Sequence, residues 1–139
     1  MPGEGILRNS APLKPMFMYT GIRVKNLDES LRFYTEVMGM KIKERYPVDA
    51  NNSEVAVVVS KDGGPEIELN YYKEGSKFNE PYSSGQELDH LAFWLGEDYD
   101  SFLSEAKKKG YDTVLEIKIP PGHRHAFIKD PNGIFILIA

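Results

Sequence analysis

The sequence predicts an α+β fold built from two successive βαβββ modules, a pair of half-barrels whose curved mixed sheet surrounds a central cleft. Three observations predict this fold. Runs rich in Val, Ile and aromatic residues alternate with two segments of helical periodicity. The order strand, helix, strand, strand, strand occurs twice. The two occurrences also align with each other, since Tyr19 falls opposite His90 and Glu68 opposite Leu137, which indicates an internal duplication.

Length and composition limit the classes of protein to consider. A chain of 139 residues can bury one core, and the absence of cysteine excludes disulfides and thiolate chemistry. A net charge of -4 argues against a nucleic-acid partner. No apolar run reaches the ~18 residues that a membrane span needs. We therefore expect one cytoplasmic domain over residues 16–139, with modules at 16–74 and 86–139, preceded by a flexible arm over residues 1–15 without the pattern of a signal peptide.

The first module begins with the β-rich stretch "MFMYTGIRV" (residues 16–24) and continues into an amphipathic helix. Asp28 is the expected N-cap and Gly39 the expected C-terminal stop, which gives a helix of about three turns. Three strands complete the module, "KIKERYPV", "SEVAVVVS" and "PEIELNYY", and the turn "KDGG" joins the last two. Four residues at helical spacing mark the apolar face of the helix: Leu31, Tyr34, Val37 and Met38.

The second module repeats this order. "LDHLAFWL" (residues 88–95) predicts a strand, "DYDSFLSEAKKKG" a helix that Gly110 closes, and "TVLEIKI" another strand. Residues 123–139 predict a hairpin that turns at "DPNG". Because duplicated half-barrels pack about a pseudo-twofold axis, residues at equivalent strand positions are expected to converge on a shared concave surface.

Four stretches resemble a known family: "TGIRVKNLDESLRFYTEVMGMK", "DGGPEIELNYY", "ELDHLAFWL" and "AFIKDPNGIFIL". In their order and spacing the chain resembles, from about Met16 to Ala139, the vicinal oxygen chelate superfamily. This superfamily includes glyoxalase I, methylmalonyl-CoA epimerase, extradiol dioxygenases, and bleomycin- and fosfomycin-resistance proteins. The resemblance implies the duplicated fold and a small-molecule substrate or ligand, but no single activity.

In metal-using members of the superfamily, four strand positions supply the metal ligands. The resemblance carries these positions to Tyr19, Glu68, His90 and Leu137, of which Glu68 and His90 match. A phenolate at Tyr19 would be costly because the unperturbed pKa of tyrosine is about 10, and Leu137 cannot coordinate a metal. In glyoxalase I and the epimerase the last ligand, a glutamate, also moves a proton next to a carbonyl. Glu68 is therefore the remaining candidate for the catalytic base.

His125 offers a replacement ligand. Alternation along "GHRHAFIKDP" places His123 and His125 on one strand face, and the resemblance to glyoxalase I turns that face toward the cavity. Glu68, His90 and His125, completed by Tyr19 or water, would form a set suited to divalent Zn, Ni, Mn or Fe. Two alternatives stay open. Glu68 and His90 can form a buried hydrogen-bonded pair without metal, and His123 and His125 can be exposed on an edge strand.

Four further residues are candidates for substrate binding: Arg23, Tyr71, Trp94 and Phe127. Arg23 lies four residues after Tyr19, hence on the same strand face, and matches an arginine that holds a substrate carboxylate in glyoxalase I. The alternative for Arg23 is a surface ion pair worth about 0–1 kcal/mol. Phe127 matches a residue that faces the cavity in glyoxalase I. Trp94 and Tyr71 can line a flat apolar pocket, although packing in the core is the ordinary role of such residues.

Three functions follow. The expected one is a glyoxalase-like, metal-dependent lyase or isomerase that acts through an enediolate on a small α-hydroxycarbonyl or thioester-type substrate, with Glu68 as base and Arg23 holding a carboxylate. The alternative is a metal-free binding protein of the bleomycin-resistance type, which suits a cationic aromatic ligand. An Fe(II) dioxygenase that uses His90 and His125 is the third. We expect a homodimer, because a monomer would leave long sheet edges exposed.

Overall fold

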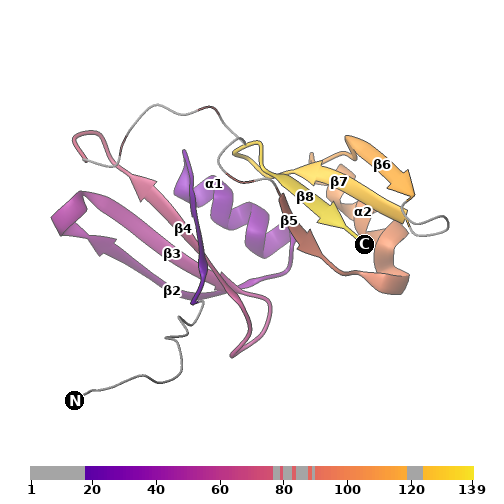
Figure 1. Cartoon of the computed structure of the whole chain (residues 1–139), viewed down its shortest axis with the longest axis horizontal. Helices are drawn as coiled ribbons and strands as arrows, with labels where there is room; N and C mark the ends of the chain where they lie inside the picture. The colour runs from indigo at the N-terminus through magenta and orange to yellow at the C-terminus, as the bar shows by residue number, and fades with distance from the viewer. Residues whose placement is uncertain (1–17, 77–78, 80–82, 84–87, 89, 119–123) are drawn as a thin grey trace, which may run out of the picture.

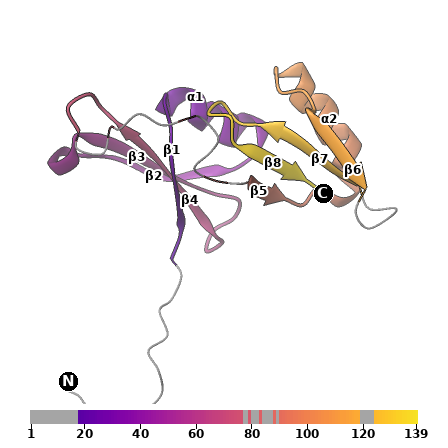
Figure 2. The ribbon, with the colours of Figure 1, turned by 45° about the horizontal axis from the view of Figure 1, so that its top comes forward.

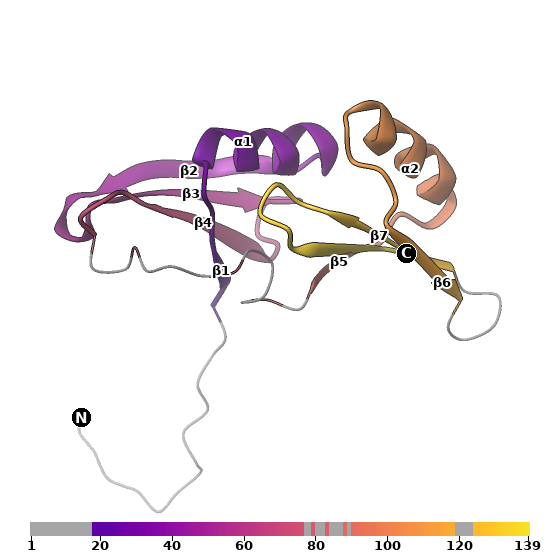
Figure 3. The same ribbon diagram turned by 90° about the horizontal axis from the view of Figure 1, so that it is seen from above.

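A computed structural model shows two four-stranded sheets side by side, with both helices on the same side of them (Figures 1 and 3). The structure describes residues 18–76, 79, 83, 88, 90–118 and 124–139. Each sheet is mixed, because one outer pair of strands is parallel and the other pairs are antiparallel. The predicted α+β fold of two βαβββ modules is confirmed, but the two sheets are not closed into one surface. The predicted arm over residues 1–15 and His123 lie outside the described residues.

The first module forms the sheet β1-β4-β3-β2, in which β1 and β4 run parallel. A register shift between Ile42 and Glu44 marks a bulge in the outer strand β2. The elements of the module are β1 (Thr20–Arg23), α1 (Leu27–Arg32), the π-helical turn η1 (Phe33–Val37), β2 (Lys41–Val48), the short helix η2 (Asp49–Asn51), β3 (Ser53–Val59) and β4 (Glu66–Tyr72).

The second module forms the sheet β5-β8-β7-β6, in which β5 and β8 run parallel. Figure 2 shows this sheet beside the first one, with α2 next to β6 and β7. The elements of the module are β5 (His90–Phe93), the short helix η3 (Gly96–Asp98), α2 (Tyr99–Lys108), β6 (Leu115–Lys118), β7 (Arg124–Lys129) and β8 (Phe135–Ile138).

Asn26 caps the first helix, so the prediction of Asp28 as the N-cap is wrong. The backbone of Asn26 is extended, with φ -142 and ψ 110, which lets its side-chain oxygen accept a hydrogen bond from the Glu29 N–H at 2.9 Å. Asp28 lies within the first turn and pairs with Arg45 instead, at 3.0 Å. The predicted stop at Gly39 agrees with its φ of 70, a left-handed conformation that favours glycine.

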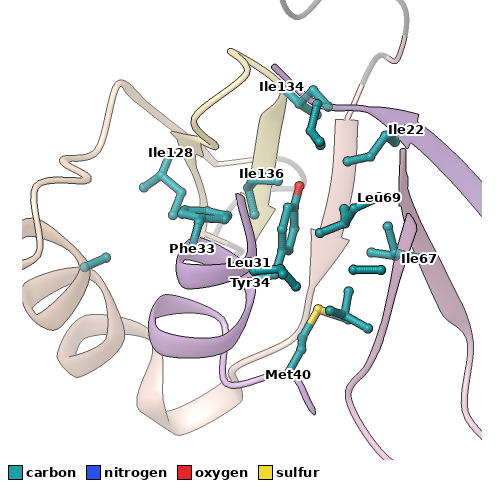
Figure 4. Packing of buried hydrophobic residues seen from close by; sticks show 14 of the residues in the cluster. Ile22, Leu31, Phe33, Tyr34, Met40, Ile67, Leu69, Ile128, Ile134 and Ile136 are labelled. Carbon is teal, nitrogen blue, oxygen red and sulfur yellow. The ribbon is translucent and has the colours of Figure 1, made fainter. Parts of the chain in front are cut away.

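Both modules contribute to one hydrophobic core, which lies between the sheets and the helices. Figure 4 shows Phe33 facing Ile128 of β7 and the Tyr34 ring between Ile136 of β8 and Leu69 of β4. These side chains are fully or almost fully buried. The first helix therefore joins the two sheets, since its apolar face packs against strands of both.

A buried polar network joins the predicted "DPNG" turn to the first module. The Tyr34 hydroxyl donates to Oδ2 of Asp130 at 3.0 Å, and Oδ1 of Asp130 accepts from the Ile134 N–H at 2.8 Å. Asn132 donates to Ser30 Oγ at 3.2 Å and accepts from the Lys25 N–H at 3.0 Å. Burial, followed by the charge and hydrogen bond of Asp130, raises the pKa of Tyr34 well above its usual value, so its hydroxyl stays protonated.

Side-chain alternation gives each sheet a helix-covered face and an open face. Ile22 and Leu69 of the first sheet and Ile136 of the second are buried on the covered faces. Glu68 and Leu137 point to the open faces, since each lies next in sequence to a strand residue that points to the core. The open faces are where a ligand can approach the strands. No helix among the described residues is long and apolar enough to cross a membrane.

Candidate functional site

Glu68 lies on the open face of the first sheet. It is on β4 and pairs in register with Gly21 of β1 and Val57 of β3. Gly21 has no side chain to cover this position, and a Cβ built there would lie 3.9 Å from the Tyr19 ring. The Tyr19 ring therefore lies against β1 close to the position of Glu68, so two of the predicted site residues share one region.

Two residues of β2, Glu44 and Tyr46, belong to the same region. Partial burial, followed by the charges of Glu68, Glu44 and Tyr19, raises the pKa of Tyr46, so these three groups lie near the Tyr46 phenol. We call Tyr19, Glu44, Tyr46 and Glu68 the tyrosine–glutamate cluster. Sequence reasoning missed Glu44 and Tyr46, although strand alternation along "KIKERYPV" places them on one face.

Arg23 lies two residues beyond Gly21 on the same face of β1. Its guanidinium carbon lies 5.4 Å from the centre of the Tyr72 ring, within the range of a cation–π interaction. Tyr71 points the opposite way and packs against the hydrophobic core. Of these two predicted substrate-binding residues, Arg23 therefore lies on the open face of the first sheet and Tyr71 does not.

His90 lies on the open face of the second sheet, at the start of β5, and is exposed. Its ring centre is 6.3 Å from that of Phe127, which is 6.0 Å from Phe135, both in edge-to-face geometry. We call these three residues the aromatic row. Leu137 pairs in register with Phe127 and shares its face. The alternative in which Glu68 and His90 form a buried pair requires a buried His90. His90 is exposed, so this alternative is wrong on that point.

His125 also lies on the open face of the second sheet, but at another level. His90 and Lys129 both pair with Phe135, so they lie at the same height in the sheet. His125 is four residues from Lys129 along β7, a distance of about 13 Å at the usual rise per residue. The two imidazoles therefore do not approach each other. Since β7 pairs with both β6 and β8, the alternative that His125 lies on an edge strand is wrong.

The residues present do not fit, within one chain, the four-ligand metal centre that the resemblance implies. Tyr19 directly precedes β1 and Glu68 lies on β4, both at the first sheet, whereas His90 belongs to the second sheet. Leu137 lies beside Phe127. By the resemblance, this is the strand position at which glyoxalase I has its last metal ligand, a glutamate. Among the described residues, no group of three or more His, Asp or Glu side chains is placed to hold a metal ion.

Trp94, the remaining predicted substrate-binding residue, follows β5 directly and is 83% exposed. It lines a cavity at the end of the second sheet together with His125. The predicted site residues of this module thus fall into two regions. His90 and Phe127 lie in the aromatic row, and Trp94 and His125 lie in the cavity at the end of the sheet.

Comparison with known proteins agrees with this fold. The family model of the Glyoxalase/Bleomycin resistance protein/Dioxygenase superfamily matches residues 17–138. A probable lactoylglutathione lyase of Vibrio parahaemolyticus is 32% identical over 123 residues, which cover 86% of each chain. A lactoylglutathione lyase of Neisseria meningitidis is 30% identical over 121 residues, which cover 84% of this chain and 83% of that protein.

The solved structure of the trypanothione-dependent glyoxalase I of Leishmania major superposes with a TM-score of 0.72 at 24% identity. The superposition covers 90% of this chain and 86% of the Leishmania chain, so the two share the fold. The matched family model spans both modules and the turn between the last two strands. The chain therefore belongs to the Glyoxalase/Bleomycin resistance protein/Dioxygenase superfamily.

Proposed function

We propose that the chain binds a small organic molecule on the open faces of its sheets without the four-ligand metal centre of glyoxalase I. The observation that carries the proposal is Leu137, which lies beside Phe127 where the resemblance requires a carboxylate. An alkyl side chain neither coordinates a cation nor moves a proton. The aromatic row instead offers edges and faces of rings, which favour a flat apolar ligand.

The test of this proposal is the metal content of the protein, purified without a His-tag and incubated with Ni, Zn, Mn and Fe(II) salts. We expect no near-stoichiometric metal after gel filtration. The Glu68→Gln and His90→Ala variants serve as matched controls, because these residues are the two donors that match the ligand positions. Near-stoichiometric metal that is lost in both variants would overturn the proposal and establish a rearranged divalent metal site.

The second candidate function is a lyase or isomerase of the glyoxalase type, favoured by the relatives named lactoylglutathione lyase. Such a reaction needs a base that removes a proton next to a carbonyl, and Glu68 is the carboxylate at a matching position on an open face. The phenol groups of Tyr19 and Tyr46 lie in the same cluster and can donate hydrogen bonds to an enediolate oxygen. Arg23 can hold a carboxylate of the substrate.

Turnover of the hemithioacetal of methylglyoxal and glutathione tests the second candidate. If this function is right, Glu68→Gln lowers the rate by about 10²–10⁴-fold, the usual contribution of a general base. Glu66→Gln is the matched control, because Glu66 lies on the same strand and is paired with Lys43. An equal rate in both variants, or no turnover in the wild type, would exclude Glu68 as the base for this substrate.

We also propose that a second copy of the chain covers the open faces in a cytoplasmic homodimer. Large apolar side chains are exposed there, including Leu115 at 51% and Phe135 at 38%. Exposed apolar surface of this kind marks an interaction site in soluble proteins. Sedimentation equilibrium of the wild type and of Leu115→Glu tests this point. A dimer that the substitution weakens is the expected result, and a monomeric wild type at all concentrations would contradict it.

A further inference from the structure

The end of the second sheet carries a cavity of about 450 Å³, which neither the tyrosine–glutamate cluster nor the aromatic row lines. It lies where the ends of β5 and β8 and the start of β7 meet the start of α2. Its volume falls within the range of about 300–1,000 Å³ usual for small-molecule sites. The lining residues that matter for recognition are Trp94, Glu97, Tyr99, Asp100, Arg124 and His125.

The indole of Trp94 forms one wall of this cavity. Gly96 has a φ of 59, and a Cβ added to it would lie 2.9 Å from Cζ2 of Trp94. The indole therefore lies across Gly96, at a position where a side chain would collide with it. Since Trp94 is 83% exposed, an aromatic face remains accessible to a ligand.

The guanidinium of Arg124 also lines the cavity and has several partners. Arg124 lies 4.4 Å above the Tyr99 ring and pairs with Asp100 at 3.0 Å and with Glu116 at 2.8 Å. The Tyr99 hydroxyl also donates to Glu116, at 2.6 Å. Arg124 therefore contacts one aromatic ring and two carboxylates at the edge of the cavity.

The charge of this region is negative. Two carboxylates, Asp100 and Glu116, pair with the single positive charge of Arg124. Of these two carboxylates Asp100 lines the cavity, and Glu97 is a second carboxylate in its lining. An exposed indole beside excess carboxylate attracts organic cations, because the ring face and the carboxylates both carry negative potential.

We propose that this cavity is a second ligand site, distinct from the tyrosine–glutamate cluster and the aromatic row, that binds a small organic cation with a flat apolar part. The cationic group would lie between the Trp94 indole and the Glu97 carboxylate, and the flat part would extend toward the Arg124–Tyr99 stack. Charge complementarity selects cations over neutral molecules and anions of the same size. The site does not depend on Glu68 or His90, so it stands whether or not the proposed function is right.

Trp94 is the single tryptophan of the chain, so its indole N–H gives one unambiguous signal in a proton–nitrogen correlation spectrum. The full chain is titrated with benzyltrimethylammonium, and separately with benzyl alcohol and benzoate at the same concentrations. We expect a saturable shift of the indole signal with the cation, and an affinity at least about tenfold higher than that for benzyl alcohol. Equal shifts with the neutral alcohol would overturn the proposal, because they indicate apolar contact without charge selection.

The variant Glu97→Gln keeps the size of the side chain and removes its charge. We expect it to weaken binding of benzyltrimethylammonium at least about fivefold. Glu105→Gln is the matched control, since Glu105 is an exposed carboxylate of α2 that pairs with Lys108. The Glu68→Gln and His90→Ala variants should bind the cation like the wild type. Unchanged affinity in Glu97→Gln, or equal loss in Glu105→Gln, would overturn the assignment.

Discussion

The Tyr34 hydroxyl donates a hydrogen bond to the buried carboxylate of Asp130 at 3.0 Å, across 96 positions of the sequence. Tyr34 belongs to the helical segment of the first module, whereas Asp130 begins the turn between β7 and β8. Those two strands carry Phe127 and Leu137, so this contact helps to fix the second open face relative to the first helix. Because both groups are buried, loss of either partner leaves the other without its hydrogen bond.

Replacement of Tyr34 by Phe should therefore destabilise the protein. The Asp130 carboxylate keeps its bonds to the Ile134 N–H and to Asn132 but loses the phenol, at a cost of about 1–3 kcal/mol. Urea unfolding at neutral pH measures the change. Tyr46→Phe is the control, because Tyr46 is exposed, and should shift the free energy of unfolding by less than about 0.5 kcal/mol. Equal effects of both variants would contradict the assigned role of the contact.

Stability should fall at alkaline pH, with Tyr34 as a main cause. Burial, then Asp130, raises the pKa of Tyr34 in the folded state above its value of 10.0 in the unfolded chain, and burial, then Glu116, raises the pKa of Tyr99 to about 12. Their contribution is thus fully present below pH 10 and is lost as the pH rises above it, because the unfolded state releases protons that the folded state holds.

The measurement is the free energy of unfolding between pH 8 and pH 11, at about half-unit steps, for the wild type and Tyr34→Phe. The variant lacks the phenol, so its stability should decline less steeply above pH 10 than that of the wild type. Parallel curves for the two proteins would show that Tyr34 ionisation does not contribute.

Much of the fold could be predicted because it depends on local patterns. The apolar spacing that includes Tyr34 predicts the buried helix face, and "DPNG" predicts the last turn, where Gly133 has a φ of 88. The hydrogen bonds that join Asp130 and Asn132 to the first module could not be predicted in this way, because they link segments that only tertiary packing brings together.

The candidate site was harder to predict, since strand alternation gives the face of a residue but not its height in the sheet. His90 and His125 lie on one face, as alternation requires, yet the register of β8 with its neighbours separates them along the strand direction. Register depends on turn geometry and packing across the sheet, which the local sequence does not reveal.

The helix cap provides a test of the corrected start of α1. Asn26→Ala removes the side-chain oxygen that accepts from the Glu29 N–H, and we expect a loss of about 1 kcal/mol in the free energy of unfolding. Asp28→Ala removes an exposed ion pair with Arg45, which is worth about 0–1 kcal/mol. Urea unfolding of both variants compares the two positions. A larger loss in Asp28→Ala would favour Asp28 as the effective cap.

Gly96 and Gly63 form a matched pair for testing how the Trp94 indole is positioned. Both have positive φ, 59 and 77, so alanine should strain the backbone at each by about 1 kcal/mol. At Gly96 the added Cβ would also lie 2.9 Å from the indole, whereas nothing lies within 4 Å of a Cβ at Gly63. Gly96→Ala should therefore displace the indole and change the emission of the single tryptophan, while Gly63→Ala leaves the emission unchanged. Identical spectra for both variants would mean that the indole does not lie against Gly96 in solution.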